Sequence, residues 1–186
     1  VKTATGAGQH QLILVPQHSW SYPTNVDDIY HFGTIADVVQ ILTMPDGAIH
    51  ALVRTTDAVA LRDIEVKDGI FSANAEPIKI ADDMGAEQTL LLRDILADNM
   101  QSLAASTRKF KAEKLRNVVN NYPLPAFIDS VIQTADIDTD VAVKVLCADS
   151  WEKKLNILLE EIKLMAETIK IEESINKRIH QQMEQG

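Results

Sequence analysis

The feature that most constrains the fold is the uneven placement of glycine along the 186 residues. Six of the seven glycines lie at or before Gly85, and the seventh is the terminal Gly186. Four of the six prolines lie at or before Pro77. Glycine and proline mark turns between strands, whereas long stretches without them are typical of helices. The sequence therefore predicts an α+β protein, with a β-rich subdomain over residues 1–80 and a helical subdomain over residues 81–186.

The first part of the chain has the pattern of strands joined by turns. Gln11 to Val15 is a short apolar run that predicts a buried strand, and residues 33–44 are rich in β-branched side chains. Pro45-Asp46-Gly47 is a turn sequence, because proline presets φ and glycine accepts the left-handed position. From Ile49 to Arg54 the side chains alternate with period two, which predicts a strand with one face turned inward. Lys67-Asp68-Gly69 predicts a second hairpin turn.

Beyond Ala86 the apolar residues recur at helical spacing. The spacing of Leu91, Ile95 and Leu103 predicts one helix. Further helices are predicted at residues 109–119, 127–134 and 141–147. The helical subdomain therefore begins with several separate helices before its longest element.

The last element is predicted to be one long helix from about residue 150 to Met183, because no breaker interrupts it. Asp149 and Glu152 have the spacing of a capping box, with Asp149 as the cap. At 1.5 Å per residue the helix is about 50 Å long. A first apolar stripe comprises Leu155, Leu158, Ile162, Met165 and Ile169. A second, displaced stripe comprises Ile171, Ile175, Ile179 and Met183. The displacement predicts that the two ends bury against different partners, and the second stripe is a candidate assembly surface.

The sequence contains no recognisable catalytic or metal-binding constellation. His31 and His50 lie beside predicted strands, and neither belongs to a known metal-ligand spacing, so both are interpreted as strand-edge or hydrogen-bonded side chains. Cys147 has an acidic neighbour and no adjacent base, which favours a buried structural cysteine over a nucleophile. The acidic pairs Asp27-Asp28 and Asp82-Asp83 are interpreted as solvated connectors or helix caps. We therefore expect no catalytic residue, cofactor site or metal site in this chain.

Three aromatic residues are candidates for contact with a protein partner. Trp20, Tyr22 and Tyr30 lie in or beside a proline-containing loop, and Trp and Tyr are favoured at binding hot spots. The alternative is that these rings cover the edge of the sheet. A basic run at residues 108–116 suits an acidic partner, although a solvated helix face is the favoured interpretation.

Charge and composition exclude several kinds of partner. The net charge of −9 argues against nucleic acid, which requires a clustered basic surface. No apolar run approaches the roughly 20 residues of a membrane span. The single cysteine excludes an internal disulfide framework and predicts a reducing compartment, the cytoplasm.

Taken in order, these segments resemble the N-terminal domain of the Lon ATP-dependent proteases. Residues 29–36, IYHFGTIA, resemble the family's L-Y-x-V-G-T-x-A, and MPDG at residues 44–47 resembles its L-P-D-G. The strand at residues 49–53 resembles V-x-V-L-V. Near the end, SWEKKL, LLEEI and INKRIHQQME resemble the family's ERL, LLEKEI and IRxRVKxQME. The resemblance extends over nearly the whole chain.

The resemblance implies a non-catalytic domain that engages unfolded or degron-bearing proteins and supports the hexamer of an ATP-dependent serine protease. ATP, Mg and the serine–lysine dyad would belong to the parent protein, since the P-loop and the dyad residues are absent from this sequence. The family's first two strands are absent too, so the β-rich subdomain is expected to be incomplete at its N-terminus. The alternative is a free-standing interaction or chaperone-like module of the same fold without a motor. A cysteine hydrolase using Cys147 is disfavoured because its base is missing.

Overall fold

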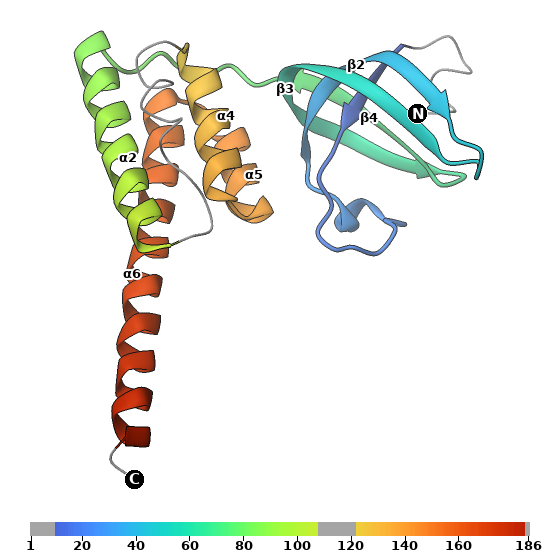
Figure 1. Cartoon of the computed structure of the whole chain (residues 1–186). Helices are drawn as coiled ribbons and strands as arrows, with labels where there is room; N and C mark the ends of the chain where they lie inside the picture. Colours follow the sequence, from blue (N-terminus) through green and yellow to red (C-terminus); the bar gives the residue numbers. More distant parts are fainter. Residues whose placement is uncertain (1–9, 108–121, 185–186) are drawn as a thin grey trace. The chain divides into compact units, whose positions relative to one another are not determined.

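The computed structural model describes residues 10–107 and 122–184 (Figure 1). Contacts divide the chain into two compact units, residues 1–79 and residues 80–186. The described part of the first unit is built on a β-sheet, and that of the second consists of helices. The predicted α+β class with a long final helix is therefore confirmed.

The first unit contains a four-stranded antiparallel sheet in the order β1-β2-β3-β4. The strands are β1 (Gln11–Leu14), β2 (Phe32–Thr43), β3 (Ile49–Lys67) and β4 (Ile70–Pro77). The loop between β1 and β2 contains the short 3-10 helix η1 (Val26–Asp28). Both predicted hairpin turns form, because Gly47 and Gly69 take positive φ angles of 84° and 75°.

Strand β3 is much longer than its alternating sequence indicated. A strand was expected from Ile49 to Arg54, but β3 continues to Lys67. The pairing with β4 shifts register between Arg62 and Glu65, and Asp63 lies there with a positive φ of 49°. Such a bulge inserts an unpaired residue and interrupts the alternation of faces, so period two alone could not show that the strand continued.

The sheet has a small core and a large amount of exposed apolar surface. The buried apolar side chains of the described first unit are Ile29, Ala36, Val59 and Leu61. Large apolar side chains that remain exposed are Leu14, Val39, Ile41, Leu42, Met44, Leu52 and Ile70. The strands carry apolar residues on both faces of the sheet. A sheet this small cannot bury both faces, so many of these apolar side chains remain exposed.

The helical unit contains four described helices packed around one core. They are α2 (Ala86–Ser106), α4 (Leu124–Ala135), α5 (Thr139–Cys147) and α6 (Trp151–Glu184). The helices predicted at residues 127–134 and 141–147 correspond to α4 and α5, whereas the helix predicted at residues 109–119 lies outside the described residues. Helices α2, α4 and α5 all contact α6. The fully buried side chains include Leu96, Met100, Leu103, Phe127, Val131, Leu155, Leu158 and Ile162.

Helix α2 forms where it was predicted, and the apolar spacing identified its inward face only in part, since Leu103 is fully buried. Leu91 is 59% exposed, whereas Leu96 is 1% exposed and Arg93 is buried. The Arg93 guanidinium donates a hydrogen bond to the carbonyl oxygen of Tyr122 (2.7 Å) and lies 4.9 Å from the centre of the Phe127 ring. Arginine is rarely buried, so a pattern of apolar residues could not place Arg93 on this face.

Helix α6 is capped by Ser150 rather than by Asp149. The Ser150 hydroxyl oxygen accepts a hydrogen bond from the backbone N–H of Lys153 (3.2 Å). Asp149 forms an ion pair with the Lys153 ammonium (2.6 Å) instead. Asp83 adds a second cap, because its carboxylate accepts a hydrogen bond from the backbone N–H of Glu152 (3.3 Å). The capping role predicted for the Asp82-Asp83 pair is therefore confirmed for Asp83.

The first half of α6 forms the central element of the helical core. The helix has 34 residues, which corresponds to about 51 Å and agrees with the predicted length. Leu155, Leu158 and Ile162 are at most 1% exposed, and Met165 and Ile169 pack against the same core. The first predicted stripe is therefore a packing surface. Figure 1 shows α6 continuing well past the ends of the other helices of its unit.

Candidate functional site

The loop between β1 and β2 presents two aromatic rings to solvent. Trp20 is 102% exposed and Tyr22 is 81% exposed relative to a fully accessible residue. Neither ring covers the sheet edge, so the covering alternative is wrong for these two residues. Exposed indole and phenol groups of this kind can contact an apolar partner without any rearrangement of the loop.

Hydrogen bonds between the two arms of this loop hold its base closed. The backbone N–H of His18 donates to the carbonyl oxygen of Asp28 (2.9 Å), and the N–H of Tyr30 donates to that of Pro16 (3.0 Å). The rings of His18 and Tyr30 are 4.0 Å apart between centroids, at an angle of 43°. Tyr30 is therefore part of the base of the loop, whereas Trp20 and Tyr22 lie beyond it.

The carboxylate of Asp28 orders the second arm of the loop. It accepts hydrogen bonds from the backbone N–H groups of Thr24 and Asn25, each at 2.8 Å. These bonds lower the pKa of the Asp28 carboxyl below its usual value, because they stabilise the charged form. The loop thus enters any encounter with a partner partly organised, which reduces the entropy lost on binding.

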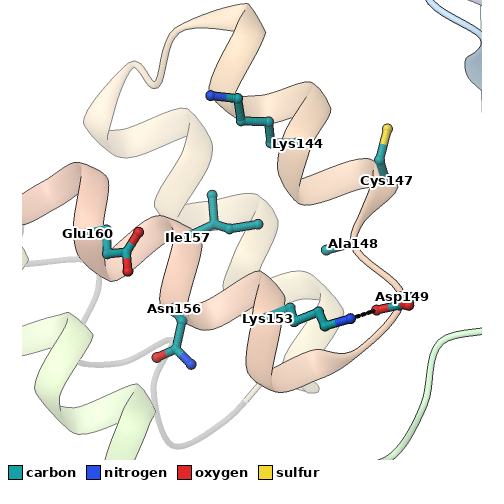
Figure 2. A pocket seen from close by; sticks show the side chains of 8 residues that line it. All are labelled: Lys144, Cys147, Ala148, Asp149, Lys153, Asn156, Ile157 and Glu160. Carbon is teal, nitrogen blue, oxygen red and sulfur yellow. Dashed lines mark hydrogen bonds and ion pairs between the residues drawn. The ribbon is translucent and has the colours of Figure 1, made fainter.

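A shallow pocket of about 550 Å³ lies at the end of α5, and its lining includes Cys147, Lys153 and Ile157 (Figure 2). Cys147 is half-buried rather than buried as expected. Burial raises the pKa of its thiol, although the Lys154 ammonium acts in the opposite direction. Lys154 is itself buried and donates hydrogen bonds to the last carbonyl groups of α5. A thiol with a raised pKa is a poor nucleophile, so this pocket lacks the features of a catalytic cysteine site.

The histidines do not assemble a metal site. His31 and His50 are both exposed on the sheet unit. Across residues 10–107 and 122–184, no three His, Cys, Asp or Glu side chains lie close enough together to hold a metal ion. Over the same residues, no helix is both long and apolar enough to span a membrane.

The distal part of α6 presents its second stripe to solvent. Ile171, Ile175, Ile179 and Met183 are 60%, 51%, 48% and 75% exposed. They recur every four residues and so lie along one side of the helix. The predicted displacement between the two stripes therefore corresponds to a change from buried to exposed positions.

Comparison with known proteins gives the family. The family model of the ATP-dependent protease La (LON) substrate-binding domain matches residues 1–163. The chain belongs to this family. The resemblance inferred from the sequence motifs is thereby confirmed.

Full-length relatives of this Lon domain carry the name Lon protease. The Lon protease of Desulforamulus reducens is 29% identical over 163 residues, which are 86% of this chain and 20% of that protein. Lon protease 1 of Hydrogenovibrio crunogenus is 22% identical over 176 residues, which are 94% of this chain and 22% of that protein. The chain thus spans about a fifth of the length of these relatives.

Two solved structures share the fold of this Lon domain. The N-terminal domain of the Mycobacterium avium complex Lon protease aligns with a TM-score of 0.58 at 17% identity, covering 87% of this chain and 80% of that one. The Lon N-terminal domain protein from Xanthomonas campestris aligns with a TM-score of 0.54 at 13% identity, covering 86% and 79%. These likenesses support the assigned α+β architecture.

Proposed function

We propose that this chain is the non-catalytic, substrate-engaging part of a cytoplasmic Lon-type ATP-dependent serine protease. It would hold unfolded or degron-bearing proteins before they are degraded. The observation that carries the proposal is the full exposure of Trp20, with Tyr22 beside it, on a loop whose base is closed by hydrogen bonds. The description of the family as a substrate-binding domain supports the same role.

The chemistry of unfolded chains explains why such a loop is suitable. An unfolded protein exposes apolar side chains, and Trp and Tyr offer large contact areas with few rotatable bonds to immobilise. Two exposed rings give weak binding, which suits transfer to a motor. ATP and Mg would act in the parent protein and have no role in this chain.

Truncation of both rings tests the proposal. The Trp20→Ala, Tyr22→Ala double variant should bind a permanently unfolded model protein, such as reduced and carboxymethylated α-lactalbumin, at least about tenfold more weakly, since a hot-spot residue contributes about 2 kcal/mol. The matched control is Leu91→Ala with Tyr122→Ala, which removes two exposed apolar side chains from the helical unit. Equal affinities of all three proteins, with unchanged circular dichroism, would oppose this role for the loop.

A second role, support of hexamer assembly, is favoured by the exposed stripe on distal α6. Four apolar side chains along one side of a helix are costly to leave in water, so a partner helix is the expected cover. Ile175→Asp should weaken self-association of the parent protein in sedimentation experiments without unfolding the chain. Retention of the full oligomer by this variant would oppose the role.

The alternative is a free-standing interaction or chaperone-like module with the same fold. The two possibilities differ in the gene sequence that follows the codon for Gly186. A P-loop ATPase encoded there supports the protease, whereas a stop codon supports the module.

A further inference from the structure

A groove beside α6 is separate from the loop between β1 and β2 and from the exposed stripe on distal α6. Its volume is about 530 Å³, within the range of known ligand pockets. Leu103 and Ala135, which are 1% and 2% exposed, lie at its base together with Met165 and Ile169. Leu164 is 56% exposed at its rim. The groove is formed by α2, α4, α6 and the residues that follow α2 and α4, and it combines these apolar side chains with a polar lining of threonines and carboxylates.

The rim of this groove is acidic. Asp136, Glu161 and Glu172 line it, and no lysine or arginine is among the described residues that do so. Asp136 is also the C-cap that follows α4, with a left-handed φ of 51°. Three carboxylates around one depression give it a negative potential that low-dielectric walls intensify.

Two helix ends add to this negative potential. Helix α2 ends at Ser106, next to the lining residue Thr107, and α4 ends at Ala135, which lines the groove itself. The C-terminus of a helix carries a partial negative charge, and a basic side chain in the last turn commonly offsets it. Neither α2 nor α4 has a basic residue in its last turn. The described lining of the groove is therefore an acidic surface that a positively charged segment would complement.

We propose that this acidic groove binds a protein segment in which an apolar side chain is flanked by lysine or arginine. The inference rests on the proposed function, because the segment would belong to a substrate protein, and it adds a preference for basic residues. The apolar side chain would contact Leu103, Met165 and Leu164, while its basic neighbours would meet the three carboxylates. A neutral apolar segment is disfavoured because it would desolvate these carboxylates without pairing them.

The test uses the complete chain and fluorescent twelve-residue peptides. One peptide alternates leucine with lysine, a second has glutamine in place of each lysine, and a third has glutamate. The lysine peptide should bind most tightly, and its affinity should fall between 50 and 300 mM salt because screening weakens charge pairing. Equal affinities for the lysine and glutamine peptides would overturn the proposal.

Neutralised variants locate the binding. The variant Asp136→Asn, Glu161→Gln, Glu172→Gln should bind the lysine peptide about tenfold more weakly, if each pair contributes as exposed pairs do. Asparagine accepts the left-handed backbone at position 136, so the fold should be kept. The matched control is Asp94→Asn, Glu160→Gln, Glu167→Gln, which removes the same charge from exposed positions outside the groove. Equal weakening in both variants would overturn the assignment to the groove.

Two further results separate this proposal from the proposed function. If unfolded α-lactalbumin binds through Trp20 and Tyr22 while the lysine peptide does not bind, the groove proposal alone is wrong. If neither ligand binds, the proposed function is wrong as well. If neutralising the basic residues at positions 108–116 strengthens peptide binding, the chain's own basic sequence is the ligand and the proposal is overturned.

Discussion

The two halves of α6 should respond very differently to the same substitution. Ile162 is completely buried in the helical core, whereas Ile175, on the same helix, is 51% exposed. Replacing each with alanine in separate variants therefore compares one residue type in one helix, and only the burial of the side chain changes.

The expected magnitudes follow from burial. Ile162→Ala leaves a cavity among fully buried side chains such as Leu96, Met100 and Leu158, and such changes cost about 2–5 kcal/mol. A domain of this size is stable by about 5–15 kcal/mol, so the loss is a large fraction of the total. Ile175→Ala removes a side chain that makes little contact, and alanine is the better helix former by a few tenths of a kcal/mol. Its effect should lie within about 0.5 kcal/mol of zero.

The two tryptophans provide the assay. Trp151 lies at the start of α6 and packs against the helical core, whereas Trp20 is fully exposed in the sheet unit. In a Trp20→Phe background, fluorescence during urea unfolding reports on the helical unit alone. The thermal midpoints of the two alanine variants should differ by about 10 °C or more, since 1 kcal/mol corresponds to about 4–8 °C in a small domain.

The result that would refute this reasoning is a similar loss in both variants of a verified monomer. Distal α6 would then be docked along its whole length, and the exposed stripe would not exist in solution. A loss below about 1 kcal/mol for Ile162→Ala would instead show that the helical core is packed differently.

Three other predictions concern single contacts. Ser150→Ala removes the cap of α6, so it should lower the free energy of unfolding of the helical unit by about 1 kcal/mol in urea titrations. An unchanged urea midpoint would contradict the capping role of Ser150. The hydroxyl of Ser150 and the N–H of Glu152 hold the pKa of the Asp83 carboxyl below its usual value, so the stabilisation is present above that usual pKa and is lost as the pH falls through the lowered one. Asp83→Asn should therefore flatten the acid limb of the stability–pH curve, and an unaltered limb would count against this bond. Gly33→Ala should destabilise the sheet by about 1–3 kcal/mol in thermal unfolding, since an added Cβ would meet the backbone oxygen of Leu14 at 2.6 Å. If the variant were as stable as the wild type, β1 would have to shift to make room.

Local patterns in the sequence were sufficient to predict most of the elements. The turns at Gly47 and Gly69 require positive φ, and only a few residue types accept that backbone, so their sequence signal is strong. The two stripes of α6 were visible because helical period is regular over a long uninterrupted segment. The exposure of Trp20 was left open, because the sequence does not show whether a loop folds back over its sheet.

The features that were missed depend on contacts between distant segments. The inward face of α2 includes Arg93, whose partner Tyr122 lies 29 positions away in the sequence. The second cap of α6 comes from Asp83, 69 positions before Glu152. The acidic groove collects Asp136, Glu161 and the end of α2 from three helices. No spacing rule within one element connects such residues, so these sites appear only after folding.

The unequal cores of the two units lead to a last prediction about the order of unfolding. The described sheet unit buries four apolar side chains, Ile29, Ala36, Val59 and Leu61, whereas the buried apolar cluster of the helical unit comprises 14 residues. Apolar burial is the main favourable term in folding, so the sheet unit should be the less stable of the two.

In hydrogen-exchange mass spectrometry with increasing urea, the amides of β2 and β3 should lose protection before those of proximal α6. The fluorescence of Trp151 should change only in the later step. Such separate transitions are expected when two units have their own cores and different stabilities. A single transition, in which strand and helix amides exchange together at every urea concentration, would show that the sheet draws its stability from the helical unit, and the argument from buried side chains would fail.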